Sequence, residues 1–313
     1  MHKVLSGLMI AGALALACRP VAPAEDTTLK VGALPVLEAL PLHVAEAQGY
    51  FQEAGIRLEI VPVASAAERD QLMQAGQIDG MINDLLSTVL FNRNEQKIAV
   101  VRSARQATTD VALFAIVAGK DSGIETAQDL KGIEIGISES TVIAYVTDRL
   151  LQRQGLSPAD IRTVNVPRIP DRMQLLSQGQ IKAATLPDPF FSLAIQQGAK
   201  VVADDRADPS LSVSAWAFSM TAMKTKPRTV RNFVAALDKA IADVNSDPAK
   251  WNSLLAEKKL IPASLVGQYT LPLFPSRSLP TPEQFQDVQE WMIGKGLIQS
   301  ALPYEQLVAV EFK

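Results

Sequence analysis

Hydrophobic runs alternate along this chain with amphipathic segments that open on capping residues and close on glycine. The first β-type run covers residues 29–34, and a helix is predicted over residues 41–49. Another helix is predicted over residues 65–76, because Ser65 and Glu68 form a capping-box pattern at its start. Strands that alternate with helices at this spacing predict parallel sheets in an α/β fold.

The same order of elements occurs twice. The segment "QLMQAGQIDG" at residues 71–80 is matched by "QLLSQGQIKA" at residues 174–183. That pair is 103 positions apart, and three further matches fall at offsets of 104 or 105 positions: Gly32 with Gly136, "IRLEIVPV" (56–63) with "IRTVNVPR" (161–168), and Asp84 with Asp188. Although βαβ units in general share glycine and isoleucine positions, four matches in one order favour a pseudo-repeat over coincidence. Two copies of the unit predict two lobes.

The pattern changes after the second copy. One more strand-like run is "VSAWAFSM" (213–220), and helical segments follow from Pro227 and from "TPEQ" (281–284). This tail has no second copy, so we expect it to pack on one lobe. The predicted organisation is a first part of lobe 1 over 29–110, lobe 2 over 111–212, and a return to lobe 1 with C-terminal helices over 213–313.

The N-terminus has the pattern of a secretory signal. Lys3 precedes an apolar stretch over residues 7–17, and "ALAC" resembles a lipobox that ends at Cys18. The stretch is shorter than the roughly 20 residues of an ordinary membrane span, which makes a membrane anchor helix the weaker alternative. We expect residues 1–17 to be a signal peptide, Cys18 to carry a lipid, and residues 18–28 to form a tether.

Composition narrows the class of protein. The chain has 313 residues, of which 48% are hydrophobic and 20% charged, as in ordinary globular proteins of one or two domains. Thirty basic residues against 33 acidic ones, without a long basic run, argue against nucleic acid as a partner. Cys18 is the single cysteine, so no intramolecular disulfide can form and the fold depends on its core.

Loops that follow the predicted strands are the candidate binding site. In a parallel sheet a ligand lies beyond the carboxyl ends of the strands, beside helix N-termini whose free N–H groups face the crevice. Two lobes would bring such loops face to face. The candidate ligand-binding residues are Pro35, Leu37, Glu38, Asn83 and Asp84 in the first unit, Ser138, Glu139, Ser140, Thr141, Asp188 and Phe190 in the second, and Trp216 in the tail.

Each candidate also has a purely structural alternative. The hydroxyl residues can be plain helix caps, the aspartates turn or cap residues, the glutamates solvated loop charges, and the two aromatic residues core. Arg105 can bind an anion or form an ordinary surface or interlobe salt bridge, and His43 is more typical of a half-buried helix residue than of a catalytic base. The four carboxylates could also converge and act in acid–base catalysis.

No metal-ligand spacing, P-loop, nucleophile elbow or dinucleotide motif occurs in the sequence. We therefore expect no metal and no cofactor, and a binding cleft is a simpler interpretation than an active site.

These segments resemble the solute-binding proteins of ABC importers, in the branch that binds sulfonates, nitrate, taurine or thiamine pyrimidines. The resemblance runs from about Leu29 to Lys313 and rests on "AEAQGYFQEAGIRLEIVPV", the "QIDG" strand, "DLKGIEIGIS", and "LPDPF" followed by "GAKVVADD". It implies a type II periplasmic-binding fold, in which two lobes, each a parallel-rich sheet flanked by helices, are joined by two crossover strands. The crossovers are expected near residues 108–113 and 209–217.

The resemblance also implies a function. Such a protein captures a small polar ligand between its lobes and delivers it to a permease with its ATPase, so we expect an exported monomer in the periplasm or on the cell surface, anchored by lipid at Cys18. Ligand contacts carry over to residues 35–39, Asn83 with Asp84, residues 138–141, and Asp188, where members often have glutamate before proline.

The charges of the candidate loops bear on the ligand. The loops carry four acidic residues and no lysine or arginine, and buried carboxylates repel an anion. We therefore expect amine, amidine or ring N–H donors, as in a thiamine pyrimidine precursor, and a sulfonate or nitrate-like anion is the alternative.

Two other functions stay open, an enzyme on the same fold and a ligand sensor for a membrane signalling protein. The enzymes of this fold work in the cytosol, and the pyrimidine synthase needs a cysteine-rich iron site and a histidine, so the leader and the composition argue against the first. Neighbouring genes for a permease and an ATPase would argue against the second.

Overall fold

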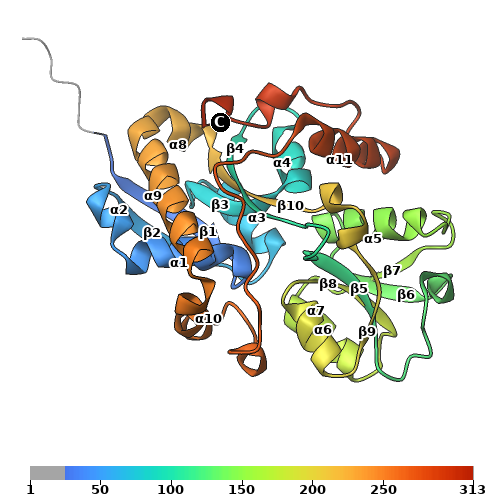
Figure 1. Cartoon of the computed structure of the whole chain (residues 1–313). Coiled ribbons are helices and arrows are strands. Elements are labelled where there is room, and N and C mark those ends of the chain that lie inside the picture. The colour runs from blue at the N-terminus through green and yellow to red at the C-terminus, as the bar shows by residue number, and fades with distance from the viewer. Residues whose placement is uncertain (1–24, 313) are drawn as a thin grey trace, which may run out of the picture.

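The computed structural model describes residues 25–312 and divides them between two sheets (Figure 1). The first sheet contains β1 (Thr28–Ala33), β2 (Arg57–Pro62), β3 (Gly80–Asp84), β4 (Ile98–Gln106) and β10 (Val213–Ser219). The second contains β5 (Phe114–Ala118), β6 (Glu134–Ile137), β7 (Arg162–Asn165), β8 (Ala183–Pro187) and β9 (Lys200–Asp204). The strand orders are β2-β1-β3-β10-β4 and β7-β6-β8-β5-β9.

Helices flank both sheets. Lobe 1 carries α1 (Leu40–Ala47), α2 (Tyr50–Glu53), α3 (Ala66–Gln74), α4 (Leu85–Asn92), α8 (Met220–Thr225), α9 (Pro227–Ser246), α10 (Asn252–Glu257) and α11 (Pro282–Gly294). Lobe 2 carries α5 (Val142–Arg153), α6 (Ile169–Ser177) and α7 (Phe190–Gln196). In each sheet three parallel strands lie beside an antiparallel strand that directly follows a connection from the other lobe, β10 in lobe 1 and β5 in lobe 2. The predicted two-lobed α/β fold is confirmed.

The repeated sequence corresponds to one packing contact that each lobe makes. A Cβ atom added to Gly32 in β1 would lie 2.8 Å from Cδ1 of Ile78, and one added to Gly136 in β6 would lie 2.6 Å from Cδ1 of Ile181. These isoleucines belong to "GQIDG" and "GQIKA", just before β3 and β8. A side chain at either glycine would therefore displace the tip of the isoleucine that precedes the neighbouring strand and packs on the sheet.

Two segments connect the lobes, residues 107–113 from β4 to β5 and residues 205–212 from β9 to β10. They overlap the expected crossovers. Asp205 holds them together, because its carboxylate oxygens accept hydrogen bonds from the backbone N–H groups of Leu113 (2.9 Å) and Phe114 (2.8 Å). Asp205 is fully buried, and this burial raises its pKa to about 6.

The C-terminal tail contacts both lobes. In lobe 1, Phe233 of α9 stacks on Phe51 of α2 with ring centroids 5.2 Å apart. Figure 1 shows α11 beside α5 of lobe 2, and Trp291 of α11 donates from Nε1 to Asp148 of α5 at 2.9 Å. The tail thus forms a third connection between the lobes, beyond the single-lobe packing that the sequence predicts.

The predicted signal peptide, Cys18 and most of the predicted tether lie outside the described residues. At the end of that tether, Glu25 accepts hydrogen bonds from N and Oγ1 of Thr229 at 2.6 and 2.7 Å, so the chain is already attached to lobe 1 before β1 begins. Within residues 25–312 no helix has both the length and the apolar character that a membrane crossing requires.

Candidate functional site

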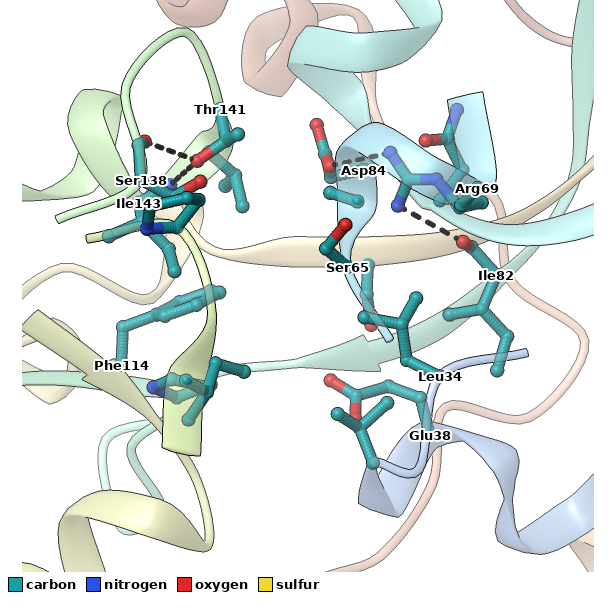
Figure 2. A pocket seen from close by; sticks show the side chains of 18 of the residues that line it. Leu34, Glu38, Ser65, Arg69, Ile82, Asp84, Phe114, Ser138, Thr141 and Ile143 are labelled. Atoms are coloured by element: carbon teal, nitrogen blue, oxygen red, sulfur yellow. Dashed lines mark hydrogen bonds and ion pairs between the residues drawn. The ribbon is translucent and has the colours of Figure 1, made fainter. Parts of the chain in front are cut away.

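A cleft lies between the lobes, at the carboxyl ends of parallel strands from both sheets (Figure 2). It contains ≈780 Å³ free of protein atoms, part of it open to solvent. The walls are mostly apolar, with Ile82 and Leu34 on the lobe 1 side and Phe114 and Ile143 on the lobe 2 side in Figure 2. Several of the predicted site residues line this cleft: Glu38, Asn83, Asp84, Ser138 and Thr141.

Other predicted site residues lie near the cleft without lining it. Pro35 faces a separate hollow of lobe 1 that also contains His43. Glu139 and Ser140 face another hollow, between α5 and α11, and the backbone of this loop turns at Ser140, where φ is 57°. Phe190 begins α7 and packs half-buried against the core of lobe 2.

Leu37 and Trp216 belong to the core of lobe 1. Both are fully buried, and neither is among the residues that line the cleft. The indole ring of Trp216 lies edge-on to Phe233 of α9, with centroids 5.9 Å apart. The run of residues 213–219 is apolar on both faces of β10, which is why the pattern alone could not tell core from cleft.

Asp188 is engaged by protein partners instead of lining the cleft. It follows β8 in lobe 2, and its Oδ2 lies 3.0 Å from Nη2 of Arg105 in β4 of lobe 1. Tyr269, from the tail, also donates a hydrogen bond from its hydroxyl to Oδ2. Both charged side chains are at least 96% buried. Of the two alternatives for Arg105, the structure therefore shows the interlobe salt bridge.

Helix N-termini converge on the cleft from both lobes. Ser65 begins α3, Asp84 begins α4 and Thr141 begins α5, and each side chain accepts a hydrogen bond from a backbone N–H of its helix. The N-terminus of α6, beside Ile169, has no side-chain cap. The capping role and the position on the cleft wall therefore coincide, and the positive ends of four helix dipoles surround the space.

An arginine lines the cleft, although the candidate loops carry none. Arg69 reaches it from the first turn of α3, and because it lies in a helix, sequence reasoning that considers only loops misses it. The capping pattern at Ser65 was the available signal, since helix N-termini face the crevice in a fold of this class. Nη2 of Arg69 lies 2.7 Å from Oδ1 of Asp70 and 3.7 Å from Oδ2 of Asp84, so carboxylates of its own lobe neutralise its charge.

Two acidic residues, Glu38 and Asp84, line the cleft. Asp84 lies near Arg69, whereas Glu38 forms no ion pair with any of the described residues. It is 6% exposed, and its Oε2 has no hydrogen-bond partner in the described part of the chain. Burial raises the pKa of Glu38, and the more distant guanidinium of Arg105 opposes this shift. Figure 2 shows its carboxyl group on the lobe 1 side, next to Leu34.

Asn83 presents a second acceptor whose orientation is determined by its neighbours. The hydroxyl of Thr88 donates to the carbonyl of Asp84 at 2.8 Å, so Thr88 Oγ1 must accept from the Nδ2 of Asn83, at 3.1 Å. The Oδ1 of Asn83 is therefore the other amide atom, and it is buried without a partner among residues 25–312. Lobe 1 thus offers two unpaired acceptor oxygens at the cleft.

The chemistry of this arrangement is that of holding a solute. It combines apolar walls, helix N-termini and two free acceptors. His43 lies in the neighbouring hollow, where burial is the largest influence on its pKa and lowers it. Within residues 25–312, no group of three His, Cys, Asp or Glu side chains could hold a metal ion.

Sequence comparison shows which known proteins this chain is similar to. A sequence model of the family described as NMT1/THI5 like matches residues 37–251. A Haemophilus influenzae protein whose name assigns it to thiamine biosynthesis is 26% identical over 285 residues, which cover 86% of this chain and 87% of that protein. The 4-amino-5-hydroxymethyl-2-methylpyrimidine phosphate synthase THI5 of Saccharomyces cerevisiae is 24% identical over 236 residues, 69% of this chain and 66% of the enzyme.

Solved structures extend the comparison to the fold. The periplasmic aliphatic sulphonate binding protein SsuA of Escherichia coli matches with a TM-score of 0.74 at 17% identity, over 90% of this chain and 97% of that one. This likeness confirms the predicted periplasmic-binding fold.

Proposed function

The chain belongs to the NMT1/THI5-like family, and from this premise we propose that it is the extracytoplasmic solute-binding component of an ABC importer. It is exported, is anchored by lipid at Cys18, and delivers its ligand as a monomer to a permease with an ATPase. The fold of the periplasmic sulphonate binding protein and the leader pattern at residues 1–17 support this proposal.

One observation carries the proposal: the cleft is built by both lobes, with Glu38 and Asn83 on one side and Ser138 and Thr141 on the other. A ligand that contacts both walls favours the closed arrangement of the lobes, and a permease can recognise that arrangement. The connections that would flex are the paired segments 107–113 and 205–212.

The ligand is a small solute with N–H donors, of which an aminopyrimidine related to thiamine is the leading example. The unpaired carboxyl of Glu38 supports this class, since a buried acceptor favours a ligand that donates to it. Relatives named for thiamine biosynthesis and pyrimidine synthesis support it as well. A sulfonate is the second candidate, favoured by the helix N-termini at the cleft.

Thermal unfolding of the purified protein tests this proposal. We expect 4-amino-5-hydroxymethyl-2-methylpyrimidine or taurine to raise the Tm in a concentration-dependent way, while nitrate and ethanesulfonate raise it less. A compound at 100 times its Kd adds about 2.7 kcal/mol to the free energy of unfolding.

Product analysis of the same mixtures separates binding from catalysis. Recovery of the unchanged compound agrees with transport. Chemical conversion of the pyrimidine would contradict the proposed function. A Tm that none of the four compounds raises would contradict it as well.

A further inference from the structure

The two lobes bury equivalent arginines but treat their charges differently. Arg69 in α3 and Arg172 in α6 each donate from Nη1 to the carbonyl of the residue thirteen positions later, at 3.2 Å to Ile82 and 2.7 Å to Thr185. In lobe 1 the carboxylates beside Arg69 neutralise it. In lobe 2 the residue that follows Arg172 is Met173, so the equivalent of Asp70 is missing.

Arg172 is a buried cation without a counter-ion. Its side chain is fully buried, and all hydrogen bonds that its guanidinium makes within the described residues go to backbone carbonyls, which include those of Val166 (2.9 Å) and Pro167 (3.3 Å). It forms no ion pair with a carboxylate of the described residues, and burial alone lowers its pKa to about 10. Asp188 occupies the position in the repeat that Asp84 occupies beside Arg69, but it forms its ion pair with Arg105 instead of Arg172.

This charge lies directly behind the lobe 2 wall of the cleft. Pro167, whose carbonyl binds the guanidinium, lines the cleft, and so does Ile169 at the start of α6. The N-termini of α5 and α6 reach the same wall, and their dipoles have the same sign as Arg172. The N-termini of α3 and α4 bring the same kind of dipole to lobe 1, but there the Asp84 carboxylate caps α4 and, with Asp70, neutralises Arg69. Lobe 2 has no such carboxylate beside Arg172, so its wall is the more positive one, whereas lobe 1 contains the unpaired acceptor oxygens of Glu38 and Asn83.

We propose that the cleft is polarised and selects a dipolar solute. Its N–H donor end lies against Glu38 and Asn83 of lobe 1, and its anionic or electron-rich end lies against lobe 2 over Arg172. Amino-substituted nitrogen heterocycles and aminoalkanesulfonates share this chemistry, because both combine N–H donors with acceptor atoms at a distance. The inference rests on the proposed function and specifies the class of solute and its orientation.

Paired compounds and paired variants test the polarity by isothermal titration calorimetry. One pair is 4-amino-5-hydroxymethyl-2-methylpyrimidine and the same ring without its amino group; the other is taurine and ethanesulfonate, with ethylamine added as the compound that lacks the anion. The wild-type protein is expected to bind at least one amino compound about 10- to 100-fold more tightly than its partner, because the partner leaves buried acceptors unpaired. Where taurine is the preferred compound, ethylamine binds at least about tenfold more weakly than taurine.

Glu38→Gln is the decisive variant, and Glu139→Gln is its control. The amide at position 38 keeps the shape of the side chain but removes the charge, so the preference for the amino compound falls to about threefold or less. Glu139 faces a different hollow, and its variant keeps the wild-type preference. An unchanged preference in Glu38→Gln overturns the lobe 1 assignment, and ethylamine binding as tightly as taurine overturns the lobe 2 assignment.

The same titrations distinguish this inference from the proposed function. Equal affinities of wild type for both members of a pair would leave a binding protein whose cleft is not polarised. Absence of binding by all five compounds would reject the ligand classes of the proposed function, and the polarity with them.

Discussion

Asp188→Ala is expected to lower the free energy of unfolding by about 3–5 kcal/mol. The reason is the position of Asp188 between the lobes, where its carboxylate neutralises Arg105 at 3.0 Å and accepts a hydrogen bond from Tyr269. Removal of the carboxylate leaves a guanidinium that is 3% exposed without its partner. Urea unfolding followed by circular dichroism measures the change.

Two further variants separate the charge effect from simple truncation. In the double variant Arg105→Met with Asp188→Leu neither charge remains, and we expect it to regain most of the lost stability. Tyr269→Phe removes a single hydrogen bond and should cost about 1 kcal/mol. A loss below about 1 kcal/mol in Asp188→Ala would show that this ion pair does not hold the lobes together.

Asp205→Ala is expected to cost about 2–4 kcal/mol, because two buried backbone N–H groups lose their acceptors. The two N–H groups belong to Leu113, the last residue of the other connection between the lobes, and to Phe114, the first residue of β5, so the variant also loosens the pairing of the two crossovers. The control is Asp204→Ala. Its side chain is 12% exposed, pairs with the half-exposed Arg206 and accepts a hydrogen bond from the backbone N–H of Arg206, so the loss should be smaller, about 1 kcal/mol.

The loss in free energy of unfolding that Asp205→Ala causes should depend on pH, and the pKa of Asp205 in the wild type determines the direction. The pKa is about 6 in the folded protein, above the ordinary value of 3.8, so the folded state holds the proton more tightly. The stability that this raised pKa contributes is fully present below about pH 4 and is lost as the pH rises through about 6. The difference between wild type and Asp205→Ala should therefore be larger at about pH 4.5 than at about pH 7, and a difference that grows with pH would contradict the assignment.

The repeat made the architecture predictable from sequence, because glycine, capping and isoleucine positions act locally and recur in both copies. The contact between Gly32 and Ile78 and its counterpart in lobe 2 correspond to letters that match in the two copies of the sequence. The same locality explains why Asn83, Asp84 and Thr141 were found, since Asn83 and Asp84 end a strand, Thr141 follows one, and Asp84 and Thr141 each cap a helix.

Long-range pairing could not be predicted in this way. Asp84 and Asp188 occupy equivalent positions in the sequence, but only Asp84 lines the cleft, because Arg105 in β4 captures Asp188 and has no counterpart in the repeat. Arg69 was missed because a long side chain reaches the cleft from inside a helix. The contact of α11 with α5 likewise depends on side chains more than 130 residues apart, such as Trp291 and Asp148.

The measurement that tests the central claim most directly is binding to a protein whose cleft has been filled. Ser138→Phe places a ring in the space between the lobes, whereas Glu139→Phe, one residue later, places it in the hollow beside α11. Titration calorimetry with the compound that gives the largest thermal shift compares the two, after circular dichroism has shown that both variants fold. We predict at least about 100-fold weaker binding for Ser138→Phe and wild-type affinity for Glu139→Phe. Wild-type affinity in Ser138→Phe would contradict a binding site between the lobes.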